Sequence, residues 1–158
     1  MLPCYANTHT ETNFTGARTS ALRESARQMI RRAVNGSSQD KVVFCGSGAT
    51  AAINKLIDVL GLRLPADPGR RRQLEKSLPD VDKPVVFIGP YEHHSNELPW
   101  RESTAQVVVI PLDAAGGIDL LALENALRTY ADRALLIGSF SAASNVTGIK
   151  SDVAAVTA

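Results

Sequence analysis

Four short apolar runs, separated by helical or irregular stretches, constrain the fold of this chain most strongly. They occupy residues 42–45, 85–88, 107–110 and 134–139. Continuous apolar runs of this length are typical of strands that are covered on both faces, as in parallel sheets. Alternation of such strands with helical or loop segments indicates an α/β protein. The sequence therefore predicts an α/β fold with a mixed, mostly parallel sheet and flanking helices.

Helices are predicted where apolar residues recur at helical spacing. The predicted ranges are 16–35, 49–60, 68–77 and 119–131. Asp119 is expected to cap the last of these, with Ile118 placed to pack on Leu123. Residues 1–15 are polar and rich in threonine, and we expect them to form an extended arm.

The first apolar run leads into a glycine-rich turn, Gly46-Ser47-Gly48, and then into a helix. Glycine has no Cβ to obstruct a sharp turn or an approaching ligand. Such a turn directs several unpaired N–H groups to one spot, where the helix dipole adds partial positive charge. A phosphate binds well in that setting. An ordinary tight strand-to-helix connection has the same pattern, and the turn alone does not separate the two interpretations.

Polar residues capable of chemistry follow three of the predicted strands. They lie at residues 46–50, 91–96 and 141–145. In open parallel sheets, ligands bind at the edge formed by the carboxyl ends of the strands. We therefore expect the three clusters to converge and to outline one pocket.

Length, charge and cysteine content limit the remaining possibilities. The chain has 158 residues and a formal net charge of +1, so its length suits one domain and its charge gives no sign of nucleic acid or an anionic membrane as partner. Cys4 and Cys45 are too few for a disulfide framework, and Cys45 is expected in the core. No apolar stretch approaches the length of a membrane span. These features predict a cytoplasmic protein.

Three motifs in order give the chain a resemblance to a known family. They are GATAAIN at residues 48–54, EHHSN with PW at residues 92–100, and SNVTG at residues 144–148. This series resembles the class V aminotransferases, and within them the cysteine desulfurase and selenocysteine lyase branch. These are pyridoxal 5'-phosphate (PLP) enzymes of fold type I. The resemblance implies that residues 36–158 form part of a PLP-binding large domain, preceded by the arm and helix of residues 1–35.

The resemblance also implies roles for individual residues. Gly48, Ala49 and Thr50 match the phosphate cradle of the family. His93 matches the histidine that stacks on the pyridine ring and shuttles protons, which makes it the catalytic candidate. Asn145 matches the residue that hydrogen-bonds the phenolic oxygen of PLP. Without the family context, a His-His pair is often a surface feature and Asn a common turn residue.

Other parts of the family pattern are absent from this sequence. PLP catalysis needs a lysine for the Schiff base, which the family carries in a Ser-x-His-Lys-type motif. It also needs an aspartate at the pyridine nitrogen, from an Asp-Gly-x-Gln-type motif. We therefore expect the N-terminal fragment of a cysteine desulfurase-like enzyme acting on an amino acid, incomplete as it stands. Its expected partners are a second copy in a homodimer or a missing C-terminal segment.

Two alternatives from other classes stay open at this point. One is a non-catalytic binding or structural α/β domain, which the missing lysine favours. The other is a nicotinamide-dinucleotide domain, because Gly46-x-Gly48-x-x-Ala51 fits the dinucleotide fingerprint. That motif needs an acidic residue at the end of the second strand, and Asp67 lies in a proline-rich segment instead. The histidine spacing matches no metal motif, so no metal is predicted.

Overall fold

The computed structural model describes residues 5–158, which separate into two compact units. The first runs up to Phe44 and the second from Cys45 to Ala158. The predicted boundary after residue 35 lies earlier in the chain and stays a prediction, and Cys4 lies outside the described residues.

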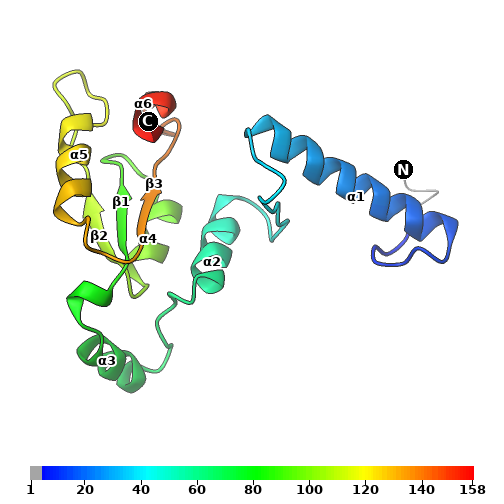
Figure 1. Cartoon of the computed structure of the whole chain (residues 1–158), viewed down its shortest axis with the longest axis horizontal. Helices are drawn as coiled ribbons and strands as arrows, with labels where there is room; N and C mark the ends of the chain where they lie inside the picture. The colour runs from blue at the N-terminus through cyan, green and yellow to red at the C-terminus, as the bar shows by residue number, and fades with distance from the viewer. Residues whose placement is uncertain (1–4) are drawn as a thin grey trace. The chain divides into compact units, whose positions relative to one another are not determined.

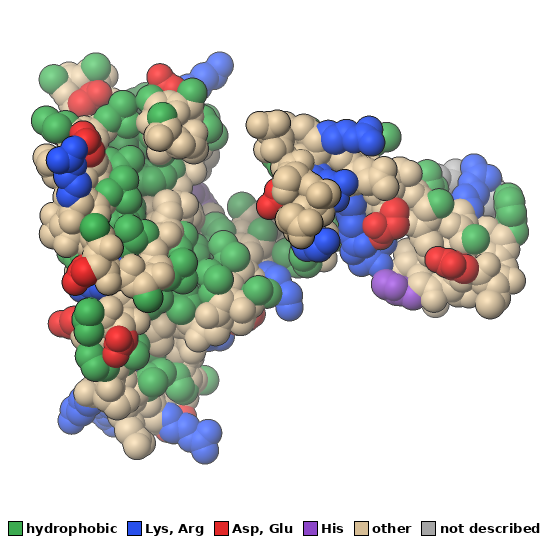
Figure 2. Space-filling model, in the orientation of Figure 1, with side chains coloured by type: hydrophobic (Ala, Val, Ile, Leu, Met, Phe, Trp, Pro, Cys, Tyr) green, Lys and Arg blue, Asp and Glu red, His purple; other side chains and the backbone are tan. Residues whose placement is uncertain are grey.

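The first unit is built on one long helix, α1 (Phe14–Ala33). The side chain of Asn13 caps its start by accepting a hydrogen bond of 2.7 Å from Gly16 N. The helix ends before Asn35, which adopts the left-handed conformation with φ 57°. The predicted helix is thus confirmed, but its apolar stripe is not buried. Leu22 and Met29 are 45% and 68% exposed, and hydrophobic side chains are visible on the surface in Figure 2.

The predicted strand at residues 42–45 is wrong. This segment belongs to no sheet, and Val43 and Phe44 are 62% and 45% exposed. A strand exists only through hydrogen bonds to a neighbouring strand, and within residues 5–158 no strand pairs with this run. The guanidinium of Arg27 lies 5.7 Å from the centre of the Phe44 ring. Cys45 is half-buried rather than part of the core.

The other three predicted strands are confirmed and form one parallel sheet in the second unit. They are β1 (Val85–Ile88), β2 (Gln106–Val109) and β3 (Leu136–Ser139), in the order β2-β1-β3. The central strand β1 is buried along its whole length, and its Val85 pairs with Gln106 on one side and Leu136 on the other. The predicted α/β class with a mostly parallel sheet is therefore confirmed.

Helices cover both faces of this sheet (Figure 1). The helices of this unit are α2 (Ala49–Val59), α3 (Pro68–Ser77), η2 (Asp80–Asp82, a 3-10 helix), α4 (His94–Arg101), α5 (Leu120–Thr129) and α6 (Val153–Thr157), of which α2, α4, α5 and α6 contribute to the two layers of the core. The predicted cap of α5 is present, since Asp119 Oδ1 accepts a hydrogen bond of 2.9 Å from Ala122 N. Helix α4 was not predicted, because its sequence is largely polar and contains Pro99.

The core of the second unit has two layers, one on each face of the sheet. Successive side chains of β1 point to opposite faces and so contribute to both layers. On one face, Val86 and Ile88 join Ile57 of α2 and Trp100 of α4. On the other face, residues before and within α5 complete a cluster of Val85, Phe87, Ile110, Ile118 and Leu123. The shared burial of Ile118 and Leu123 agrees with the predicted contact between them. This packing fixes where the strand ends, and the segments that follow them, can lie.

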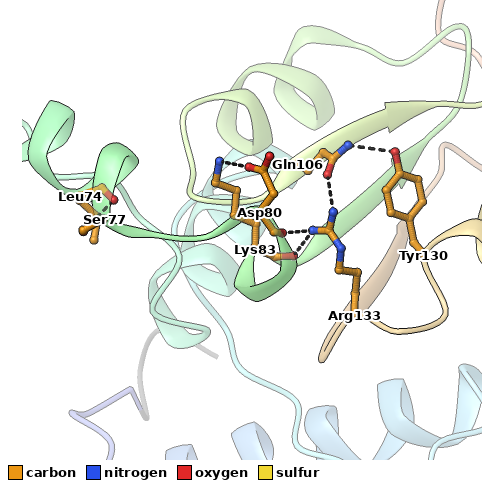
Figure 3. Close-up of polar contacts among 7 residues, drawn as sticks. All are labelled: Leu74, Ser77, Asp80, Lys83, Gln106, Tyr130 and Arg133. Carbon is orange, nitrogen blue, oxygen red and sulfur yellow. Dashed lines mark hydrogen bonds and ion pairs between the residues drawn. The ribbon is translucent and has the colours of Figure 1, made fainter.

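The amino ends of β1 and β2 are tied together by Arg133 (Figure 3). Its guanidinium donates to the carbonyl oxygens of Asp80 and Lys83 and, at 3.1 Å, to Gln106 Oε1. Gln106 Nε2 in turn donates to the Tyr130 hydroxyl at 2.9 Å. The hydrogen bond and charge of Lys83 lower the pKa of the Asp80 carboxyl. A cavity of about 470 Å³ lies at this edge, beside α3 and η2.

Candidate functional site

The candidate site is a cavity of about 430 Å³ at the opposite edge of the sheet, where the strands end. Its lining comes from the start of α2, the start of α4 and the end of β3 with the residues after it. These lining residues are Ala49, Ile53, His93, Ser95, Asn96, Gly138, Ser139, Phe140 and Ser141. All three predicted polar clusters therefore contribute to one cavity. In parallel sheets this edge is the one that binds ligands, which favours it over the larger cavity at the amino ends.

The start of α2 presents free backbone donors to this cavity. Gly48 is the N-cap residue, with φ 83° and ψ 174°, and no side chain caps the helix there. Its positive φ, rather than a lack of space, requires glycine, since a Cβ would meet nothing within 4 Å. The first N–H groups of a helix have no partner within the helix. The helix start is therefore uncapped beside Ala49, and anion binding there stays a prediction.

His93 is the N-cap residue of α4, and this role orients its ring. Its Nδ1 accepts a hydrogen bond of 3.1 Å from Ser95 N and lies 2.9 Å from Ser95 Oγ. A backbone N–H can only donate, so Nδ1 is an acceptor, and the neutral ring carries its proton on Nε2. The side chain is exposed and lines the cavity, where a flat group could lie against it.

Glu92 connects the ends of two strands, a role that the sequence analysis missed. Its Oε1 accepts from Gly89 N at 3.2 Å and from Ser141 N at 2.8 Å. Its Oε2 accepts from Ser141 Oγ at 2.5 Å and from Asn96 Nδ2 at 2.8 Å. Gly89 follows β1, and Ser141 follows β3. The carboxylate therefore joins the two strand ends that border the cavity.

Asn96 and Trp100 continue this network into the core. Asn96 Nδ2 donates to Ser139 O at 2.9 Å, and Ser139 Oγ donates to Asn96 Oδ1 at 2.5 Å. Trp100 Nε1 lies 3.1 Å from Ser139 Oγ and 3.3 Å from Asn96 Oδ1. Asn96 and Trp100 are four residues apart on one face of α4, and Glu92 lies a further four residues before Asn96, just ahead of the N-cap residue His93. That spacing is the signal from which α4 and the network could have been predicted.

Three predicted site residues, Gly48, Thr50 and Asn145, do not line the cavity. Thr50 is exposed in the first turn of α2, where its carbonyl accepts from Asn54 Nδ2 at 2.9 Å. Asn145 is exposed in a turn that Ser144 stabilises, because Ser144 Oγ accepts from the backbone N–H groups of Val146 and Thr147. Their roles toward a cofactor stay predictions, as do those of Gly48, Ala49 and His93. Among residues 5–158, no lysine lines this cavity.

Three further observations concern a dinucleotide site, a metal site and a membrane span. The dinucleotide fingerprint needs a strand before its glycine turn, and residues 42–45 form none. Within residues 5–158, no group of three or more His, Cys, Asp or Glu side chains is placed to hold a metal ion. In the same part of the chain, every helix is too short or too polar to cross a membrane.

Comparison with known families identifies the class of protein to which this fold and site belong. The family model for Aminotransferase class-V matches residues 2–158. The chain therefore belongs to the class-V aminotransferase family. This agrees with the predicted resemblance, which rested on three sequence motifs in order.

Curated relatives of the chain are cysteine desulfurases. A cysteine desulfurase from Synechococcus elongatus is 29% identical over 147 residues, which cover 90% of this chain and 20% of the relative. A probable cysteine desulfurase from Halalkalibacterium halodurans is 30% identical, covering 79% of the chain and 27% of the relative. One from Streptomyces coelicolor is 26% identical, covering 96% and 33%. The chain thus spans between a fifth and a third of the length of these relatives.

Solved structures agree on the fold. The cysteine desulfurase CsdA from Escherichia coli superposes with a TM-score of 0.55 at 23% identity, over 96% of this chain and 34% of that one. Mouse CSAD superposes with a TM-score of 0.56 at 18% identity, over 89% and 30%. At this level of identity the likeness concerns the fold alone.

Proposed function

We propose that this chain supplies the part of a cysteine desulfurase-like active site that binds the phosphate and the ring of PLP. The observation that carries the proposal is that the uncapped start of α2 and the oriented ring of His93 border one cavity. The relatives at 26–30% identity support the same activity. The amino-acid substrate and the homodimer expected from the sequence belong to this proposal.

The residues present fit PLP at both of its ends. The phosphate would lie at the N–H groups that follow Gly48, where the charge of an anion is favourable. The ring would lie beside His93, whose imidazole is flat and exposed on the cavity wall. The cavity volume of about 430 Å³ falls within the range of roughly 300–1,000 Å³ that is usual for small-molecule sites.

The chain's own residues would have distinct tasks at this site. PLP, when bound, supplies the electron sink for removal of a group from the β-carbon of an amino acid, such as sulfur from cysteine. His93, with its proton on Nε2, would stack on the ring and hold a proton that it can exchange with substrate. The α2 start would fix the phosphate, and Asn145 is proposed to reach the phenolic oxygen.

A proline at the first position of α2 tests the phosphate end. Ala49→Pro removes one N–H donor, while proline remains well tolerated at the first helical residue. Loss of one hydrogen bond to a charged group is expected to weaken binding of pyridoxamine 5'-phosphate by about tenfold or more. This probe has no aldehyde, so surface lysines do not trap it, and its binding is followed by fluorescence. Leu120→Pro makes the same change at the start of α5, away from the cavity, and should leave affinity unaltered. Equal affinity of the Ala49→Pro variant and the unaltered chain would contradict the proposed phosphate position.

Replacing His93 tests the ring end. His93→Ala removes the stacking surface, so affinity for pyridoxamine 5'-phosphate should fall by about three- to tenfold, the range for one aromatic contact. Affinity for inorganic phosphate, measured by phosphorus NMR, should not change, because the phosphate lies at α2. His94→Ala is the matched control, since His94 is the next residue and does not line the cavity. A parallel loss of both ligands would place His93 at the phosphate instead of the ring.

A further inference from the structure

Glu92 stands out because its carboxylate is hydrogen-bonded to three separate segments. The donors are Gly89 N after β1, Asn96 Nδ2 on α4, and both the backbone N and the Oγ of Ser141 after β3. An ionised carboxylate offers about four acceptor positions. All of them are therefore used, and the carboxylate acts as a cross-link rather than as a solvated surface charge.

The partners of this carboxylate are neutral. In the described part of the chain, no lysine or arginine forms an ion pair with Glu92. Hydrogen bonds between neutral donors and a charged acceptor are directional and stronger than those between neutral groups. The directions of these four hydrogen bonds thus fix the position of the Glu92 carboxylate. The carboxylate in turn holds each of its donors in place.

The backbone around β1 leaves space for this group. A Cβ on Gly89 would lie 2.6 Å from Glu92 Oε1, which is closer than side-chain carbons approach oxygen. The carboxylate therefore occupies space that a side chain at residue 89 would need. The absence of a side chain at Gly89 is thus needed for the observed position of the carboxylate. A glutamate that moved freely in solvent would place no such demand on residue 89.

Two partners of Glu92 line the candidate site from different sides. Asn96 belongs to the wall that carries His93, and Ser141 belongs to the wall that follows β3. Asn96 also holds Ser139 through two hydrogen bonds, so both walls are connected twice. We infer that Glu92 is a positioning residue, which holds the His93 wall and the Ser139–Ser141 wall at the separation needed for the cofactor ring. For the identity of the ligand, this inference rests on the proposed function.

The test replaces Glu92 by an isosteric amide. In Glu92→Gln the side-chain NH₂ occupies one carboxylate position, where it faces the donor of Asn96 or the amide of Ser141. We expect affinity for pyridoxamine 5'-phosphate to fall about tenfold, as for loss of a hydrogen bond to a charged group. Affinity for inorganic phosphate should stay within about twofold, because the start of α2 makes no hydrogen bond to Glu92. A purely structural role would lower both affinities together or neither.

A second readout needs no ligand at all. The amide protons of Gly89 and Ser141 should shift upfield in Glu92→Gln and exchange faster with solvent, because each loses a charged acceptor. Glu97→Gln on α4 is the matched control, where Glu97 pairs with Arg101 at 2.7 Å. Ser141→Ala removes only the hydroxyl donor and serves if Glu92→Gln does not fold.

These readouts separate failure of the inference from failure of the proposed function. If the unaltered chain does not bind pyridoxamine 5'-phosphate, the proposed function is wrong, and the amide shifts alone decide whether Glu92 links the two walls. Unchanged Gly89 and Ser141 amides in Glu92→Gln would overturn the link. Changed amides with unchanged affinity for pyridoxamine 5'-phosphate would overturn the positioning role.

Discussion

Replacing Trp100 by alanine is expected to lower the free energy of unfolding of the unit from Cys45 to Ala158 by about 3–5 kcal/mol. Trp100 is 1% exposed and packs between α2 and the sheet with Ile57 and Val86. Its removal leaves a cavity that the surrounding residues cannot fill. It also takes away the indole donor to Ser139 Oγ. Both effects destabilise the end of β3, which borders the candidate site.

The measurement is urea denaturation followed by circular dichroism, because Trp100 is the only tryptophan and its fluorescence disappears with the substitution. Leu98→Ala is the control on the same helix. Leu98 is 51% exposed, so its loss should cost less than about 1 kcal/mol. A change of under 1 kcal/mol for Trp100→Ala would mean that this core is not packed as described.

Replacing Gly46 by alanine is expected to lower the free energy of unfolding of the same unit by about 2–4 kcal/mol, for two separate reasons. Gly46 has φ 48°, a conformation that disfavours any residue with a Cβ. An added Cβ would also lie 2.4 Å from Ala51 Cβ. The turn before α2 must then move, and binding of inorganic phosphate should weaken as well.

A double substitution separates the two causes. Ala51→Gly removes the atom that the new Cβ would meet, at its own cost of about 1 kcal/mol for glycine within a helix. The double variant Gly46→Ala/Ala51→Gly should therefore be more stable than the sum of the two single changes predicts, while the cost of the positive φ remains. Simple additivity in urea denaturation would show that the two residues do not touch.

Much of the fold could be predicted from sequence because the deciding forces act within a few residues. Strands β1, β2 and β3 are apolar runs, and helices α1, α2, α3 and α5 have helical spacing or capping residues such as Asn13 and Asp119. The glycine turn before α2 followed from Gly46 and Gly48, whose positive φ angles are local properties. Three motifs in order sufficed to indicate the family.

The tertiary structure decided matters that depend on residues far apart in the chain. The apolar run at residues 42–45 has the composition of a strand but forms none, because pairing requires a partner that its own sequence does not specify. Of the predicted site residues, Ala49 and His93 border one cavity, whereas Gly48, Thr50 and Asn145 do not line it.

The role of Glu92 shows most clearly why contacts between distant residues could not be predicted from the sequence. Its carboxylate meets Ser141, 49 positions further along the chain, only because β1 and β3 are adjacent in the sheet. Sequence determined most of the helices and strands and the chemical groups that they carry, since propensity, capping and turn conformation are short-range, although it missed α4 and predicted a strand at residues 42–45 that does not form. Which side chains face one another across the site was decided by strand order and by burial against Trp100, which are properties of the assembled fold.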